Sequence, residues 1–459
     1  MTRFFVRGEP PSDLRKPFLA AIRLRAFQPL DPDGEANEAS GWCVMDRPFD
    51  LDFEPDKVFE DRFLLLGFRI DRFRVPPAMV RAQMADEEAR ALHRTGKNRL
   101  SRNERLEIRD KIVRRLRRKL APSTRAIDVV WDLDGGTVLF FSHSKRVLAD
   151  FCALFERTFR LALDEDSPYR AALRANLPRA LLRELDHVEP MALRRTASSK
   201  AKRLAASAAP PANGSSRATL GASDTSRRTT PMASDANGSQ RATSTASDAN
   251  GSRRAAPSAN DAEDDPLRRI ETTRFLGSEF LLWIWLRGEL STASIRLDGD
   301  TELDVWLDRQ LTLESPIDKN ERVTVRGMAP ADAEEAREAV RAGKLPVVAR
   351  IVLRNVERDF VAGLVAPRFG ITGAKVPAVL KEDAGEAFID RMALCEELFG
   401  MLDGLYRAFL LERLSDTWTL GWEPAIAAWA ADESIPAAVL QKLAPPKRGK
   451  RAATRTNTE

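Results

Sequence analysis

The stretch from residue 62 to residue 74 reads Arg62-Phe-Leu-Leu-Leu-Gly-Phe-Arg-Ile-Asp-Arg-Phe-Arg74, and Val75-Pro76-Pro77 follows it directly. Its near-alternation of apolar and other residues predicts a β-strand, and the change of spacing after Gly67 predicts a bulge. The two prolines end the strand, and a proline here suits the first turn of a helix that starts at Ala78. We therefore expect a strand that leads directly into a helix.

Two helices joined by a short loop should follow this strand. The first helical pattern covers residues 78–94 and is interrupted by Thr95-Gly96. The next segment opens with Ser101-Arg-Asn-Glu104, which has the form of a capping box, with Ser101 as the N-cap and Glu104 at the third helical position. A second helix is therefore expected from this point to about residue 120.

Strands and helices alternate in the rest of the chain as well. Before residue 190 we expect a hairpin of strands 127–133 and 137–142, and then a helix over 144–163. After residue 269 the expected strands are 293–297, 302–306, 323–326, 347–353 and 360–365, and the expected helices are 280–287, 331–342, 382–413 and 423–443. The sequence thus predicts an α+β fold with two mixed lobes, 1–190 and 269–445.

A segment of low complexity separates the two lobes. No Phe, Trp or Tyr occurs from Ala171 to the residue before Phe275, and 196–260 consist mostly of Ala, Ser, Thr, Gly, Asn, Pro and Arg. The sequence Ala-Ser-Asp-Ala-Asn-Gly-Ser occurs at 233 and again thirteen residues later. Such a composition cannot bury enough apolar area to offset the entropy of ordering. We expect a disordered linker over 191–268 and a basic disordered tail over 446–459.

Charge is strongly segregated, although the whole chain has a formal net charge of only +5. Residues 261–445 have 22 basic and 33 acidic side chains, net −11, whereas 191–260 have 11 and 3, net +8. The densest basic block is 81–119, with fourteen basic and six acidic side chains, net +8. This block lies within the two expected helices, and a cationic helix that docks one apolar face on a core can present the other face to a polyanion. Nucleic acid is therefore the first partner to consider.

The second helix has two distinct faces at about 100° per residue. Its apolar residues cluster on one side, Arg105 and Arg109 lie near the apolar seam, and Lys111, Arg114, Arg115 and Arg118 fall opposite. The preceding loop extends the cationic patch. The predicted DNA-binding residues are Lys97, Arg99, Arg102, Lys111, Arg114, Arg115, Arg118 and Lys119. The alternative is a solvated helix face stabilised by Glu107→Lys111 and Asp110→Arg114 pairs four residues apart, and the sequence leaves the two interpretations evenly balanced.

Other groups of polar residues give no catalytic signal. Asp132 and Asp134 flank a hairpin turn, and Asp164-Glu165-Asp166 is interpreted as a solvated helix end; neither resembles the carboxylate cluster that a nuclease uses to hold metal ions. The histidines at 93, 143 and 187 lack the spacing of metal ligands. Trp283 and Trp285 are interpreted as core residues and not as a base-stacking pair. We expect no enzymatic activity, no cofactor and no metal.

The expected environment of the chain is the cytoplasm. Cys43, Cys152 and Cys395 are far apart and show no zinc-site spacing, which fits a reducing compartment. The first residues lack the apolar region of a signal peptide, and the longest apolar runs are far too short to cross a bilayer. We therefore expect a soluble protein with no membrane partner.

Several short segments, taken in order, resemble the recombination-associated protein RdgC family across most of both lobes. They are Ala26-Phe27-Gln28-Pro29, Gly41-Trp42, Phe63-Leu64-Leu65-Leu66, Val75-Pro76, residues 97–104 with Arg109-Asp110, Val130-Trp131-Asp132, Phe140-Phe141-Ser142 with Lys145, Arg341-Ala-Gly-Lys344 before residues 351–354, and Asp403-Gly-Leu-Tyr406. The chain departs from short family members by the insertion at 191–268. Residues 275–286 and the region after Thr417 also look distinctive.

The resemblance implies a protein that binds double-stranded DNA without sequence preference. It implies a homodimer closed into a ring with a positively charged hole, association with the nucleoid, and restraint of the RecA recombinase by competition for DNA. It also matches Lys97, Arg99, Arg102 and the cations of the following helix to the basic helical segment of the family. Two other functions stay open at this stage: a metal-dependent DNA exonuclease, and an interaction scaffold whose basic helix binds an acidic protein.

Overall fold

The computed structural model describes residues 1–11, 13–191, 266–290, 294–297, 302–356 and 358–443. Residues 192–265 of the linker expected over 191–268, and the tail expected over 446–459, lie outside the described residues. Residues 266–268 of the expected linker are helical, so its predicted end is wrong. Helix α10, Pro266–Thr272, starts before the expected lobe boundary at 269. No helix in the described ranges combines the length and the apolar composition that a bilayer crossing requires.

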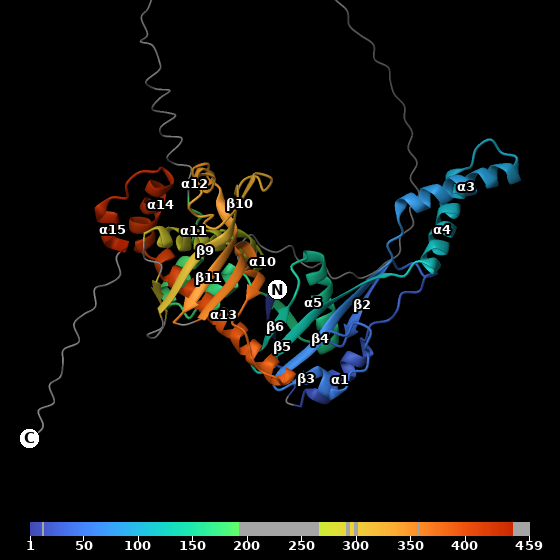
Figure 1. The fold of residues 1–459 in the computed structure, drawn as a ribbon, viewed down its shortest axis with the longest axis horizontal. Coiled ribbons are helices and arrows are strands. Elements are labelled where there is room, and N and C mark those ends of the chain that lie inside the picture. The colour runs from blue at the N-terminus through green and yellow to red at the C-terminus, as the bar shows by residue number, and fades with distance from the viewer. Residues whose placement is uncertain (12, 192–265, 291–293, 298–301, 357, 444–459) are drawn as a thin grey trace, which may run out of the picture. The chain divides into compact units, whose positions relative to one another are not determined.

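The amino-terminal part builds a seven-stranded antiparallel sheet in the order β2-β4-β5-β6-β1-β7, with β3 paired to β4 (Figure 1). Its strands are β1 Thr2–Arg7, β2 Glu38–Cys43, β3 Phe59–Glu60, β4 Phe63–Arg72, β5 Ser123–Asp132, β6 Thr137–Phe140 and β7 Ala162–Glu165. Its helices are α1 Arg15–Leu24, α2 Pro55–Val58, α3 Pro77–Thr95, α4 Arg102–Lys119, α5 Lys145–Phe159, α6 Pro168–Arg174 and α7 Arg179–Leu185. The predicted strand, helix pair and hairpin are therefore all present.

Strand β4 is buried on both faces, from Phe63 to Asp71. Leu64, Leu66, Phe68 and Ile70 pack with α1 and α5, whereas Phe63 and Leu65 belong to a core shared with the carboxy-terminal part. The strand pairs with β5 in unbroken register, from Phe63 opposite Asp132 to Arg72 opposite Ser123. The predicted bulge is therefore wrong, because a strand covered on both sides needs no alternation.

The expected helix over 144–163 ends earlier than predicted. Helix α5 stops at Phe159, and Arg160 adopts the left-handed conformation, with φ 61°, that commonly ends a helix. The following residues form β7, which pairs with β1 so that Phe4 lies opposite Glu165. Asp166 follows β7 and is only 2% exposed. The interpretation of Asp164-Glu165-Asp166 as a solvated helix end is therefore wrong.

The carboxy-terminal part has its own antiparallel sheet, in the order β10-β9-β11-β12-β13, with β8 paired to β9. Its strands are β8 Ser294–Arg296, β9 Glu302–Glu314, β10 Arg322–Arg326, β11 Leu345–Asn355, β12 Arg358–Val365 and β13 Gly370–Lys375. Besides α10, its helices are α11 Phe275–Glu289, α12 Glu334–Arg341, α13 Ala384–Arg413, α14 Glu423–Ala430 and α15 Ala437–Leu443, with a 3-10 turn at Ala366–Arg368 and a π-helical turn at Trp418–Trp422.

Most predicted elements of this part are present, with different ends. The single helix expected over 423–443 is wrong, because the chain breaks it between α14 and α15, with Asp432 at a φ of 59°. Trp283 and Trp285 of α11 are buried, 0% and 2% exposed, which confirms their interpretation as core residues.

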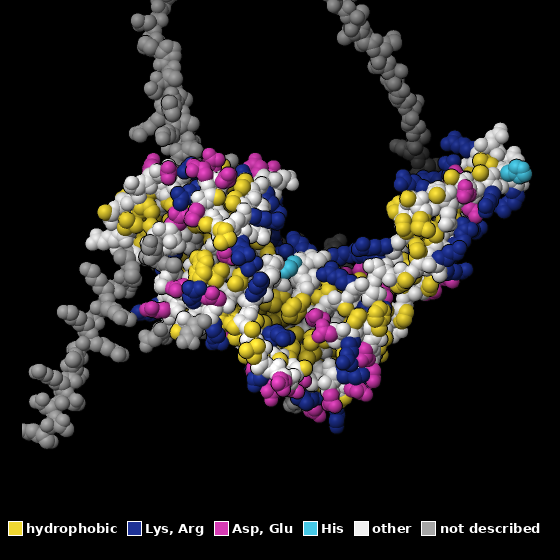
Figure 2. Space-filling view, in the orientation of Figure 1, with side chains coloured by type: hydrophobic (Ala, Val, Ile, Leu, Met, Phe, Trp, Pro, Cys, Tyr) yellow, Lys and Arg dark blue, Asp and Glu magenta, His cyan; other side chains and the backbone are white. Residues whose placement is uncertain are grey.

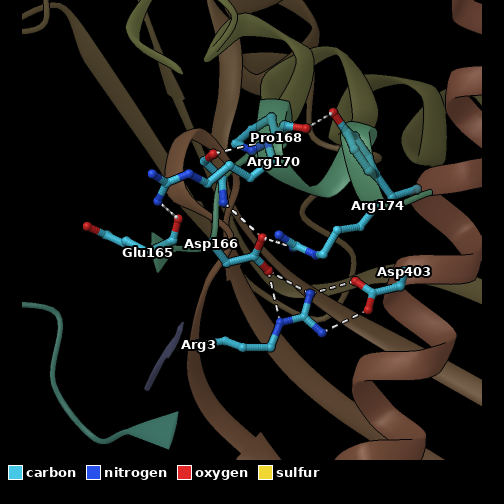
Figure 3. Close-up of polar contacts among 9 residues, drawn as sticks. Arg3, Glu165, Asp166, Pro168, Arg170, Arg174 and Asp403 are labelled. Carbon is cyan, nitrogen blue, oxygen red and sulfur yellow. Dashed lines mark hydrogen bonds and ion pairs between the residues drawn. The ribbon is translucent and has the colours of Figure 1, made fainter. Parts of the chain in front are cut away.

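The two sheets meet in one core. A single hydrophobic cluster contains Phe63 and Leu65 of β4 together with residues of α11, α13 and the second sheet. Polar contacts reinforce this connection: the Arg3 side chain donates to both Asp166 and Asp403, and the Tyr406 hydroxyl donates to the Pro168 carbonyl at 3.0 Å (Figure 3). The two lobes are therefore packed together through residues far apart in the sequence.

Candidate nucleic-acid interface

The basic block folds as a helical hairpin, α3 and α4, inserted between two neighbouring strands. Arg72, at the end of β4, pairs with Ser123, at the start of β5, so the chain leaves the sheet and returns beside its point of exit. Figure 1 shows α3 and α4 side by side beyond the ends of these strands. The sheet thus fixes both ends of the hairpin.

Local sequence signals set the limits of the two helices, as predicted. Gly96 ends α3 in the left-handed conformation, with a φ of 63°. Glycine adopts this conformation readily because it has no Cβ atom. The capping box is present: the Glu104 backbone N–H donates to Ser101 Oγ at 3.3 Å, and the Ser101 backbone N–H donates to Glu104 Oε2 at 2.7 Å. Lys97 also donates to Glu104, and these hydrogen bonds from Lys97 and Ser101 lower the pKa of Glu104 to about 2. The start of α4 is therefore a tightly bonded turn.

Helix α4 is held to the body of the protein by few residues. Ile112 and Leu116 are buried as expected, but Leu106 is 46% exposed because no element covers it. Arg117 is also buried: it donates to the Gly34 carbonyl at 2.7 Å and to Asn37, and its guanidinium lies 5.6 Å from the centre of the Phe73 ring. The sequence prediction left Arg117 out of the DNA-binding set but did not predict its burial, because its hydrogen-bond partners are about eighty residues away.

All eight predicted DNA-binding residues are exposed, and three of them have acidic partners. Lys97 pairs with Glu104 at 2.7 Å, Arg115 with Glu87 at 3.2 Å, and Arg118 with Asp33 at 2.7 Å. The hydrogen bond to Asp33 raises the pKa of Arg118. These three cations are partly neutralised before any ligand arrives.

The other five cations have no ion-pair partner within the described part of the chain. They are Arg99, Arg102, Lys111, Arg114 and Lys119. The pairs expected four residues apart, Glu107 with Lys111 and Asp110 with Arg114, do not approach to 4.0 Å; α4 instead pairs across to α3, as in Arg105 with Glu88. The hairpin therefore presents uncompensated positive charge to solvent (Figure 2).

The eight predicted DNA-binding residues do not all line the same depression. Lys97, Arg99 and Arg102 line a hollow of about 700 Å³ together with Arg105 and Arg109. Lys111, Arg114 and Arg118 do not line it and lie opposite the buried Ile112 and Leu116. The hairpin thus has a cationic outer side on α4 and a second, hollowed cationic side near the loop.

The remaining sequence candidates have structural roles. Asp132 accepts hydrogen bonds from the backbone N–H groups of Asp134 and Gly135, at 3.2 and 3.1 Å, which confirms its interpretation as a turn residue. Within the ranges that the structure describes, no group of three or more His, Cys, Asp or Glu side chains is placed to hold a metal ion.

No protein-family model matches this chain, and no curated protein sequence matches it.

Proposed function

We propose that the chain binds double-stranded DNA without sequence preference through the α3–α4 hairpin. The observation that supports this most strongly is the set of five exposed cations without an ion-pair partner among the described residues: Arg99, Arg102, Lys111, Arg114 and Lys119. Phosphate groups can neutralise such cations, and the release of condensed counterions then provides the binding free energy. Contacts of this kind are made to the DNA backbone and do not depend on sequence.

Duplex DNA fits this surface better than a single strand does. Proteins that bind single strands without sequence preference usually stack the bases on aromatic side chains. Residues 77–119 contain no Phe, Tyr or Trp. A helix of fixed length with regularly spaced Lys and Arg suits the regular phosphate array of a duplex.

The resemblance to the RdgC family adds an oligomeric state and a cellular role to the proposal. On this basis the chain acts as a ring-shaped homodimer on the nucleoid, in the cytoplasm, and restrains RecA-dependent recombination by competing for DNA. These parts of the proposal rest on the resemblance, and the hairpin geometry supports only the DNA contact.

Salt titration of duplex binding tests the DNA contact. The log of the binding constant should fall with the log of the salt concentration, with a slope near roughly −0.9 per phosphate contact. We expect the double variant Lys111→Gln with Arg114→Gln to flatten the slope by about two contacts per subunit. The matched double variant Arg115→Gln with Arg118→Gln should flatten it less, since Glu87 and Asp33 already pair with those cations.

The same titration distinguishes the alternatives. An unchanged slope in the first double variant, with helicity intact by circular dichroism, would contradict the proposed DNA face and favour a scaffold that binds an acidic protein. Degradation of linear duplex in Mg²⁺ or Mn²⁺ would instead favour the exonuclease alternative. Binding should be equal for two unrelated duplex sequences of the same length.

A further inference from the structure

The base of the hairpin contains a second depression, with an apolar floor. It measures about 680 Å³, and Phe73, Val75, Val80, Met84 and Val113 contribute its apolar surface. We call this depression the hairpin groove. Helix α3 buries only Ala91 among its nineteen residues, so its apolar side chains near the groove remain partly open to solvent. Figure 2 shows hydrophobic side chains gathered beside the Lys and Arg side chains of the hairpin.

The rim of the hairpin groove is positively charged. Arg81 and Arg109 line it, are exposed, and have no ion-pair partner within the described residues. The one carboxylate on the rim, Glu88, pairs with Arg105 at 3.5 Å. The other polar residue, Asn37, accepts a hydrogen bond from the buried Arg117. The groove therefore offers a ligand two free guanidinium groups around an apolar floor.

We propose that the hairpin groove binds an acidic peptide that inserts a large apolar side chain between α3 and α4. The apolar floor favours a hydrophobic anchor, and Met84 can adapt to its shape. Arg81 and Arg109 would pair with carboxylates on either side of that anchor. Duplex DNA presents phosphates and base edges to a protein and has no large apolar side chain that projects far enough to fill the floor. A second copy of the hairpin would bring two segments of net charge +8 together.

The hairpin groove and the outer cations Lys111 and Arg114 lie on different sides of α4. At about 100° per residue, Lys111 and Arg114 lie roughly 200° and 140° around the helix from Arg109. Val113, which lines the groove, lies only about 40° from Arg109. Lys111 and Arg114 can therefore contact DNA while a peptide occupies the groove. Arg109 also lines the hollow that contains Arg99 and Arg102, so peptide and DNA would compete at that end of the hairpin.

Fluorescence anisotropy with a defined probe tests the proposal. The probe is a labelled twelve-residue peptide with Glu on one face and Leu and Phe at helical spacing on the other, and its control carries Gln in place of every Glu. We expect the full-length chain to bind the acidic probe more tightly than the Gln control. Arg81→Gln with Arg109→Gln should weaken acidic-probe binding roughly five- to tenfold, since each exposed ion pair contributes modestly.

Two further variants make the test specific. Met84→Gln should weaken both peptides while leaving duplex DNA affinity within about twofold, since it removes no charge. Lys111→Gln with Arg114→Gln should leave acidic-probe binding within about twofold. Equal losses in both double variants would overturn the proposal, because they would indicate general charge attraction. Absence of probe binding, or a homodimer that Met84→Gln dissociates in sedimentation, would also overturn it.

Discussion

Arg3 and Asp166 form a buried ion pair, with Nη2 and Oδ2 2.6 Å apart, although 163 residues separate them in the sequence. Their side chains are 7% and 2% exposed (Figure 3). Arg3 also donates to Asp403 of α13, and Arg174 donates to Asp166. Burial disfavours the charged guanidinium, but Asp166 and Asp403 more than offset this, so the pKa of Arg3 is raised. The first strand is thereby bonded to the carboxy-terminal part.

We expect Asp166→Ala to lower the free energy of unfolding by about 3 to 5 kcal/mol, because the buried Arg3 would keep only the half-exposed Asp403 as a carboxylate partner. Asp403→Ala is the matched control. Its carboxylate is 49% exposed, so its loss should cost less than about 1 kcal/mol. Urea denaturation of both variants measures the difference. Equal losses would mean that Arg3 depends on Asp403 as much as on Asp166.

Stability should fall as the pH drops from about 6.5 to about 4, in part because of His143. Burial, and then the positive charges of the Met1 amino group and Arg368, lower the pKa of His143 to about 4. Its Nε2 lies 2.9 Å from the Met1 nitrogen. Between its folded and unfolded pKa values the unfolded chain binds more protons, so stability rises with pH in that window. The urea midpoint should therefore change less between pH 5 and 6.5 in His143→Gln than in the wild type, and an equal change would exclude this role.

Two glycines of α11 should respond in opposite directions to the same substitution. A Cβ at Gly277 would lie 2.0 Å from the Ala366 carbonyl oxygen, whereas a Cβ at Gly288 would meet nothing within 4 Å. Gly277→Ala should destabilise the protein by about 1 to 3 kcal/mol or more, because backbone has to move. Gly288→Ala should stabilise it by up to about 1 kcal/mol, since alanine favours the helix. Thermal unfolding of both variants gives the comparison, and stabilisation by Gly277→Ala would show that the close approach is relieved easily.

Removal of an intramolecular partner should release a cation for DNA. Glu87 pairs with Arg115 across the hairpin at 3.2 Å and, more loosely, with Arg90 on its own helix at 3.7 Å. Glu87→Gln should therefore strengthen duplex binding and steepen the salt slope by up to about one contact, or roughly 0.9. Glu107→Gln removes the same charge from an exposed residue of α4 that has no ion-pair partner among the described residues, and should steepen the slope less. Identical slopes would mean that Arg115 does not contact DNA.

The limits of the hairpin could be predicted because short-range chemistry determines them. Ser101 and Glu104 are three residues apart and bond to each other's backbone, and Gly96 supplies a conformation that other residues adopt at a cost. Strands β1 and β7 were not predicted, because each is short and pairs with a segment remote in sequence. Asp166 was misinterpreted for the same reason: its partner Arg3 is 163 residues away.

The sequence by itself determined that α4 is a helix with an apolar side and a densely cationic remainder, since periodicity and capping act within a few residues. Only the tertiary structure decided which of those cations remain without an acidic partner. Arg118 pairs with Asp33, and Arg115 pairs with Glu87. Arg117 is buried against Phe73. Lys111 and Arg114 have no acidic partner among the described residues. The physical reason is that an ion pair depends on distance in space, and distances across a fold are not encoded in the local pattern of residues.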